Sequence, residues 1–187
     1  MTQDHHDHEG NDHEEEHDHE HVEAYLLDGA QMHFISLVAG TLGFLKERGI
    51  SADEWTQYFG QKFYDSWEGL MGVGAAEALE QVIPIQVESM GAEIISGVGT
   101  EQRAVVTVGA IPSRAVLEKF GGTPRQILRG FGITQEEFAK IFDVFKIPAS
   151  VAGFAFTHTA AKNARVITLR RLARRQAPKR GSRPRPT

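Results

Sequence analysis

The residue types best suited to metal chemistry lie at the N-terminus, where residues 5–21 read HHDHEGNDHEEEHDHEH. Seven histidines alternate there with eight acids, whereas a purification tag is normally a run of histidine alone, so we treat the segment as native. Zinc, nickel, cobalt and copper(II) accept imidazole nitrogen, with carboxylate oxygen as a further ligand. The sequence therefore predicts binding of nickel, zinc or a similar divalent ion through His5, His6, His8, His13, His17, His19 and His21. The alternative is a solvated acidic tail that keeps the protein soluble.

Two further histidines lie among apolar residues. His33 falls on an apolar helical segment, and His158 alternates with aromatic residues on an expected strand. A lone buried histidine is more often a hydrogen-bonded core residue than a ligand or a base. If the core holds a pocket, His158 is its expected polar group, and the expected apolar lining is Phe156, Tyr64, Trp67 and Trp55. Ordinary core packing is the alternative interpretation of these aromatic residues.

Enzyme chemistry finds little support in the residue pattern. Asp65 and Glu68 lie one helical turn apart, as two acid–base groups would, yet no partner for them is evident. The chain has no cysteine, which excludes a disulfide framework, a thiolate zinc site and a cysteine nucleophile. We therefore predict no catalytic residue and favour a non-enzymatic role.

Two long helices are expected to position these groups. Residues 30–48 are apolar on nearly all sides and end in Lys46, Arg48 and Gly49, which predicts a largely buried helix. Ser51 and Glu54 form a capping box that starts a second helix, which we expect to continue until Pro84 kinks or ends it.

The C-terminal half is expected to form a sheet with short helices. Residues 92–110 predict a hairpin with its turn near Gly99–Gln102, and residues 153–171 predict a second hairpin joined by AAKN. Between them, short helices are expected over 113–120 and 124–129, and from Thr134 to a stop before Pro148. The predicted fold class is α+β, with a helical N-terminal half packed on a small antiparallel sheet made of two hairpins.

Charge divides the chain into three parts. Residues 1–23 hold ten acids and no Lys or Arg, and residues 170–187 hold eight bases and no acid. We expect a disordered metal-binding tail over 1–23, one ligand-binding domain over 24–171 and a disordered basic tail over 172–187. The basic tail lacks interleaved aromatic residues, so sequence-specific recognition of nucleic acid is not expected. Neither a signal peptide nor a transmembrane segment is evident, which predicts a cytoplasmic protein.

Two stretches carry a resemblance to known families. In the order of its expected helices and hairpins, the chain resembles the domain shared by aminothiazoline-carboxylate hydrolase-like proteins and 4-vinyl-reductase (hydrocarbon-binding) proteins over roughly residues 30–170. The resemblance is clearest in the segment AEIISGVGTEQRAVVTVGAIP and in the later segment IPASVAGFAFTHTAAKNARVITLRR. Members usually place cysteines near both hairpins, and this chain has none, so no catalytic residue is transferred. The resemblance implies a fold that encloses a small apolar or aromatic ligand, often as a homodimer, in sensors and accessory proteins.

The predicted function is therefore a non-enzymatic small-molecule-binding sensor or accessory domain with a metal-chelating tail for storage or delivery. One alternative is a hydrolase or reductase acting on a small ring compound, with His158 as proton donor. The other is an electrostatic binder of nucleic acid or a membrane surface through the Arg-rich C-terminus.

Overall fold

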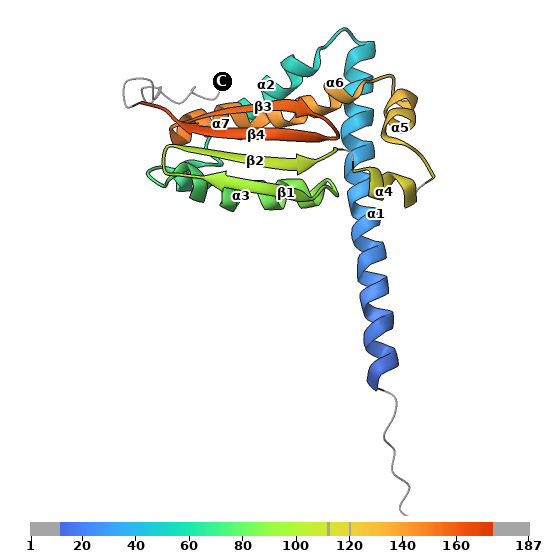
Figure 1. The fold of residues 1–187 in the computed structure, drawn as a ribbon. Coiled ribbons are helices and arrows are strands. Elements are labelled where there is room, and N and C mark those ends of the chain that lie inside the picture. The colour runs from blue at the N-terminus through green and yellow to red at the C-terminus, as the bar shows by residue number, and fades with distance from the viewer. Residues whose placement is uncertain (1–11, 112, 120, 174–187) are drawn as a thin grey trace, which may run out of the picture.

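The computed structural model describes residues 12–111, 113–119 and 121–173, and gives only the backbone for residues 12–25 and 114–116. Figure 1 shows the described elements along the chain. The helical half contains α1 (Asp12–Glu47), α2 (Ala52–Lys62), the 3-10 helix η1 (Glu68–Leu70) and α3 (Ala75–Ser89). The elements that follow are β1 (Ile94–Gly99), β2 (Arg103–Gly109), α4 (Arg114–Lys119), α5 (Pro124–Gly130), α6 (Gln135–Ala139), the 3-10 helix η2 (Lys140–Phe145), α7 (Lys146–Ala152), β3 (Phe154–Ala161) and β4 (Ala164–Arg171).

The two predicted hairpins join into one antiparallel sheet of four strands in the order β1-β2-β4-β3. Val106 of β2 pairs with Ile167 of β4, and Phe156 of β3 pairs with Leu169 of β4. Because side chains alternate between the faces of a sheet, these four residues share one face, where all are buried. The α+β fold class and both hairpins are thus confirmed.

Helices cover the buried face of the sheet, and they lie behind the strands in Figure 1. Helix α3 packs on β1, β2 and β4, helix α7 packs on β3, and α2 packs in turn on η2 and α7. Helix α1 contacts α2, α3, α4 and α6 along its C-terminal half. The described residues form one hydrophobic core between these layers, with Phe138, Phe142 and Phe154 among its largest fully buried side chains.

The first hairpin holds the N-terminus of α3 in place. The N–H groups of Ala75 and Ala76 donate to the carbonyls of Glu101 and Thr100, at 2.9 Å and 3.1 Å. These N–H groups belong to the first helical turn, where no intrahelical acceptor exists. The approach is close enough to require glycine at position 99, since a Cβ there would lie 2.7 Å from that of Ala76.

The predicted helix starts are confirmed at three capping boxes. The side-chain oxygens of Ser51, Thr123 and Thr134 accept from the N–H three residues later, and the side chain at that later position accepts from the cap N–H. Each box satisfies two backbone N–H groups that a helix start otherwise leaves without partners. These caps therefore fix where α2, α5 and α6 begin.

Helix α1 differs from its prediction in length and in burial. It begins at Asp12, so residues 12–23, expected to lack regular structure, continue the helix, whereas residues 1–11 lie outside the described part of the chain. A packed C-terminal half provides the nucleus from which a helix propagates at low cost. The expectation of a largely buried helix is wrong for one face, where Leu37 is 69% exposed and Phe44 is 53% exposed.

Two predictions that relied on proline as a helix stop are wrong. The second helix does not run to Pro84 but ends at Lys62, and α3 starts separately after Gly72, whose φ of +95° no helix accommodates. Pro84 lies inside α3. Pro148 does not stop a helix either, because it falls in the first turn of α7, where a backbone N–H has no intrahelical partner to lose.

None of the helices in the described segments is both long enough and apolar enough to cross a membrane.

Candidate functional site

An apolar groove of about 700 Å³ lies between α1, α2, α3 and η2. Its volume falls within the range of small-molecule sites, which is about 300–1,000 Å³. Aromatic and aliphatic side chains dominate its lining: Phe34, Leu37, Val38, Trp55, Phe59, Phe63, Trp67, Val82, Ile85, Met90, Ile141, Val144 and Phe145. The polar lining residues are Thr41, Ser66, Gln81 and Gln86, and none of the described lining residues carries a charge.

Polar contacts link neighbouring walls of the groove. The Gln31 side chain of α1 donates from Nε2 to the carbonyl of Glu88 in α3, at 2.7 Å. On the other side, Lys140 Nζ of η2 lies 2.8 Å from Asp53 Oδ1 of α2. The Gln31 contact is largely shielded from water, because that residue is 8% exposed. Each wall is thus tied to a neighbour that is distant in sequence.

Aromatic rings give the groove surfaces suited to an apolar or aromatic molecule. The ring centroids of Trp55 and Phe59 on α2 are 4.9 Å apart. At the base, Trp67 stacks on Phe145 with a centroid distance of 5.9 Å and an interplanar angle of 26°. Trp67 is 5% exposed, so its position is fixed by core packing. Binding an apolar molecule here would remove further aromatic surface from water.

The structure brings some of the predicted pocket residues together and separates others. Trp55 and Trp67 both line the groove. Phe156 lies behind Trp67, with ring centroids 6.2 Å apart, and is buried in the core. Tyr64 is 36% exposed and is not among the described residues that line the groove. His158 does not line it either, because it belongs to a separate polar cluster.

His158 lies in a buried chain of side-chain hydrogen bonds. Its Nε2 is 2.7 Å from Asp143 Oδ1 of η2, and its Nδ1 is 2.7 Å from Arg165 Nη1 of β4. A guanidinium group can only donate, so Nδ1 accepts and the ring proton lies on Nε2, from which it is donated to Asp143. Lys146 Nζ also lies 2.8 Å from Asp143, and Arg165 reaches towards Glu136 at 3.4 Å.

Burial and charge favour the neutral ring of His158. Loss of solvent is the largest cause that lowers the pKa of His158, and the charge of Arg165 lowers it further, while Asp143 acts in the opposite direction. Burial alone would raise the pKa of Asp143, but hydrogen bonds from Lys146 and His158 outweigh it, so that this pKa is also lowered. Both ring nitrogens of His158 are engaged, so proton exchange with a substrate would require breaking one of these contacts.

The sequence interpretation missed Asp143 and Arg165 as partners of His158 and missed Phe34 and Phe59 as groove residues. An acid within the apolar stretch KIFDVF is a signal of a buried, paired carboxylate. Arg165 likewise occupies a buried position of β4, in register with Val108 of β2. For the two phenylalanines no sequence signal separates groove lining from core.

The predicted metal ligands fall on the least described part of the chain. His5, His6 and His8 lie outside the described residues. His13, His17, His19 and His21 lie on α1, where only the backbone is described. Elsewhere in the described part, no group of three or more metal-ligating side chains comes together.

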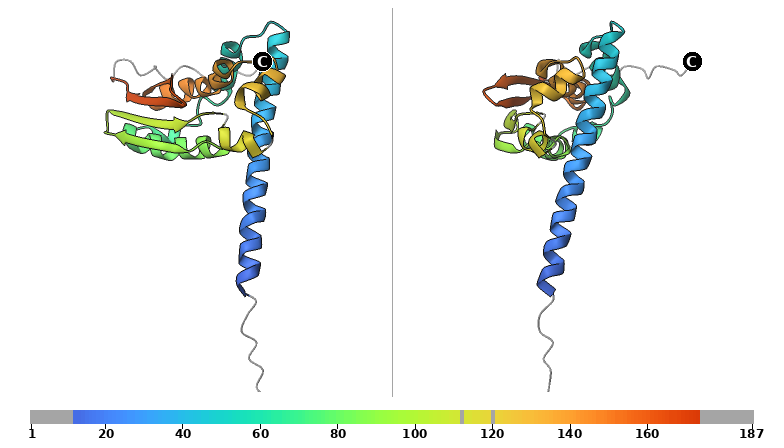
Figure 2. Two further views of the ribbon diagram at one scale, coloured as in Figure 1. Left: turned by 45° about the vertical axis from the view of Figure 1, so that its right-hand side comes forward. Right: turned by 90° about the vertical axis from the view of Figure 1, so that its right-hand side faces the viewer.

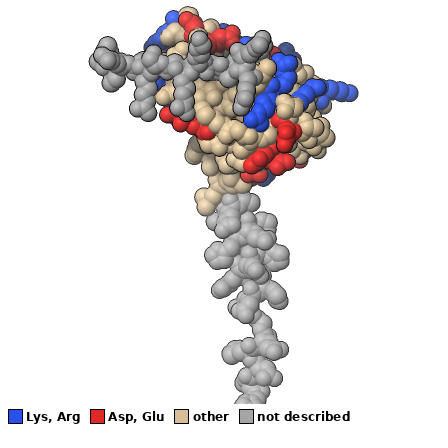
Figure 3. Space-filling view, turned by 90° about the vertical axis from the view of Figure 1, so that its left-hand side faces the viewer, with Lys and Arg blue, Asp and Glu red and all other residues tan. Residues whose placement is uncertain are grey.

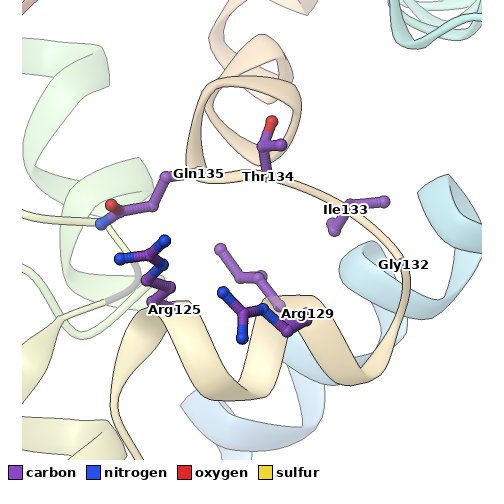
Figure 4. A pocket seen from close by; sticks show the side chains of 7 residues that line it. Arg125, Arg129, Gly132, Ile133, Thr134 and Gln135 are labelled. Atoms are coloured by element: carbon purple, nitrogen blue, oxygen red, sulfur yellow. The ribbon is translucent and has the colours of Figure 1, made fainter.

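A second hollow, of about 560 Å³, lies between α5 and the start of α6. Figure 4 shows Arg125 and Arg129 on successive turns of α5, with the side chains of Arg125 and Gln135 pointing towards each other across it. Guanidinium groups bind carboxylate and phosphate oxygens, so this hollow can receive an anion. Both arginines are solvent-exposed.

Comparisons with protein-family models, with curated proteins and with solved structures found no match for the chain. The resemblance drawn from the two hairpin segments therefore stays a prediction.

Proposed function

We propose that the domain is a non-enzymatic sensor or accessory protein that binds a small apolar or aromatic molecule in the groove between α1, α2, α3 and η2. The observation that carries the proposal is an aromatic-walled groove of about 700 Å³ without a charged lining residue among those described. Moving a charged group from water to such an environment is costly unless it is paired. The ligand is therefore expected to be neutral, with Thr41, Ser66, Gln81 or Gln86 as its polar contacts.

The alternative functions have less support from the geometry. For a hydrolase or reductase, His158 would have to give up its contact with Asp143 or Arg165 before it could serve as proton donor. For an electrostatic binder, residues 174–187 of the basic tail lie outside the described chain. On the face shown in Figure 3, Lys and Arg side chains lie beside Asp and Glu side chains.

A rim substitution with a matched control tests groove binding. Ile85 lines the groove and is 68% exposed, so Ile85→Arg introduces charge without disturbing the core. Val98 on β1 is 73% exposed and does not line the groove, so Val98→Arg is the control. The probe is N-phenyl-1-naphthylamine, a neutral apolar dye. Ile85→Arg is expected to weaken its binding about tenfold, equivalent to about 1.4 kcal/mol, because part of the apolar contact is lost.

The two variants also show how the proposal fails. If the dye does not bind saturably, or if Ile85→Arg and Val98→Arg bind it equally well, the groove is not the ligand site. Quenching of Trp55 and Trp67 fluorescence by the dye provides a second readout, since these are the only tryptophans of the chain and both line the groove.

We propose as a second function that the histidine-rich segment chelates Ni²⁺ or Zn²⁺. The supporting observation is that α1 begins at Asp12, so that positions 13, 17 and 21 share one face of a helix. Two histidines four residues apart on a helix can share one metal ion. His17 belongs to both such pairs, whereas position 19 has no histidine three or four residues away.

Calorimetric titration with Ni²⁺ separates this arrangement from a simple count of histidines. His17→Gln is expected to lower the affinity markedly because it breaks both pairs. His19→Gln is the matched control and is expected to have a smaller effect. Equal effects of the two substitutions would mean that helical spacing does not govern binding.

A further inference from the structure

The hollow beside α5 carries two arginines whose charges the surrounding side chains leave uncompensated. Arg125 and Arg129 are four residues apart on α5, and both line the hollow of about 560 Å³. Like charges at this spacing on a helix repel each other. No acidic residue lines the hollow in the described part of the chain, and neither arginine forms an ion pair with a described carboxylate.

The acids at the start of α6 are engaged with other cations. Glu136 lies 3.4 Å from Nη2 of Arg165, and Glu137 accepts from Nζ of Lys46 at 2.8 Å. Each of these carboxylates thus balances the charge of a cation that does not line the hollow. The two guanidinium groups on α5 therefore leave a local surplus of two positive charges.

Hydrogen bonds fix the backbone that joins the two sides of the hollow. At the end of α5, the N–H of Gly132 donates to the carbonyl of Arg129 at 2.9 Å, and the N–H of Ile133 donates to that of Leu128 at 3.1 Å. Gly132 has a φ of +72°, and its own carbonyl accepts from Nζ of Lys46 at 3.0 Å. The walls of the hollow are therefore in place before a ligand binds, which lowers the cost of binding.

The hollow is separate from the apolar groove. Figure 2 shows the yellow segment that contains α5 lying beside α1 in both views. The groove lies between α1, α2, α3 and η2, and the described residues that line it include none that line the hollow. A ligand of the hollow is therefore independent of the function proposed for the groove.

The lining of the hollow combines charge with an apolar floor. Leu128 and Ile133 line it beside the arginines, and they are only 1% and 5% exposed. The side chain of Gln135 points towards Arg125 in Figure 4 and offers a neutral amide. The volume also exceeds the needs of a bare ion, since a water molecule occupies about 30 Å³. The lining thus suits an anion that carries an apolar body.

We propose that the hollow binds a small phosphate monoester with an apolar body. A phosphate monoester carries a charge of about −1.5 to −2 at pH 7, which matches the two guanidinium groups, whereas a carboxylate would neutralise only one of them. Guanidinium groups donate paired N–H groups to phosphate oxygens, so Arg125 and Arg129 hold the phosphate. Leu128 and Ile133 contact the apolar body.

Calorimetric titration of the full chain with phenyl phosphate tests the site. Saturable binding is expected, and Arg125→Gln and Arg129→Gln should each weaken it at least about tenfold, because each removes charged hydrogen bonds. Arg103→Gln is the matched control, since Arg103 is an exposed arginine of β2 that does not line the hollow. It should change the affinity less than about twofold. Absence of saturable binding, or an equal loss in all three variants, would overturn the proposal.

Two further probes test the selectivity for a phosphate monoester. Inorganic phosphate should bind more weakly than phenyl phosphate, because it makes no contact with the apolar floor. Benzoate should also bind more weakly, because it carries a single charge. If inorganic phosphate binds as tightly as phenyl phosphate, the hollow takes a bare anion only. If benzoate does so, the hollow does not select a doubly charged group. Either result would contradict the proposal.

Discussion

Two glycines of α1 give opposite expectations for the same substitution. A Cβ at Gly29 would meet no atom within 4 Å, whereas a Cβ at Gly43 would lie 2.2 Å from the carbonyl oxygen of Phe131 and 3.2 Å from its carbonyl carbon. In a helix interior, Gly→Ala normally stabilises by about 1 kcal/mol. Gly29→Ala should show this gain. Gly43→Ala must push the backbone at Phe131 away by about 1 Å, because non-bonded atoms pack at about 3.5 Å.

The expected difference between the two variants follows from the cost of such overpacking, which is about 1–3 kcal/mol. For a chain of this size, 1 kcal/mol corresponds to about 2–4 °C in the melting temperature. Gly29→Ala should therefore melt about 2–4 °C above the wild type, and Gly43→Ala should melt about 2–12 °C below Gly29→Ala. Thermal unfolding followed by circular dichroism measures both.

The same pair of variants shows whether the connection between α5 and α6 braces α1. Phe131 lies in this connection and contacts α1 at Gly43, and its ring also approaches Gly40. If Gly43→Ala melts as high as Gly29→Ala, the connection yields freely and does not fix the position of α1. The groove wall formed by Phe34 and Leu37 would then need another support.

Two further predictions concern the buried cluster around His158, whose ring faces Asp143 and Arg165, with Lys146 next to Asp143. The pKa of His158 is lowered in the folded protein, so just below pH 6.5 the unfolded chain binds more protons than the folded chain does. The stability contributed by neutral His158 is therefore present above pH 6.5 and is lost as the pH falls towards the folded pKa. In urea unfolding between pH 7 and pH 5, His158 should make the free energy of unfolding change by at most about 1.4 kcal/mol per pH unit. His158→Gln should remove this pH dependence, and the control His33→Gln should retain it. Equal pH dependence in the two variants would contradict an origin at His158. Arg165→Met should lower the free energy of unfolding by about 1–3 kcal/mol, because it leaves His158 Nδ1 unpaired. The same variant should raise the pKa of His158 in an NMR titration. An unchanged pKa would mean that the guanidinium charge does not act on the ring.

The local elements could be predicted from the order of residues alone. Helix starts at Ser51 and Thr134 followed from capping boxes, in which all the interacting groups lie within four residues. The start after Thr123 followed from Pro124 at the first helical position, and the capping box found there was not predicted. The first hairpin followed from β-branched runs on either side of a short turn, and the second followed from alternating apolar residues. At the second turn, Asn163 adopts a positive φ of 54°, as turn asparagines often do. These features could be predicted because neighbours in sequence decide them.

Which element covers which face became evident from the three-dimensional packing. The sequence of α1 is apolar on nearly all sides, and nothing in it shows that the side bearing Ile35 is covered while that bearing Leu37 is exposed. The walls of the groove meet through Gln31 and Glu88, which are 57 residues apart in sequence. Side-chain periodicity indicates that a face is apolar, but the covering element depends on the packing of distant segments.

The same reason explains the outcome for the predicted site residues. The aromatic spacing that singled out Trp55 and Trp67 also occurs in ordinary cores, and it did not separate them from Tyr64, which lies apart from the groove. The alternation around His158 predicted a buried ring but not its partners. Asp143 and Arg165 reach that ring from η2 and β4, and only the packing of those elements on β3 brings the three groups within hydrogen-bonding distance.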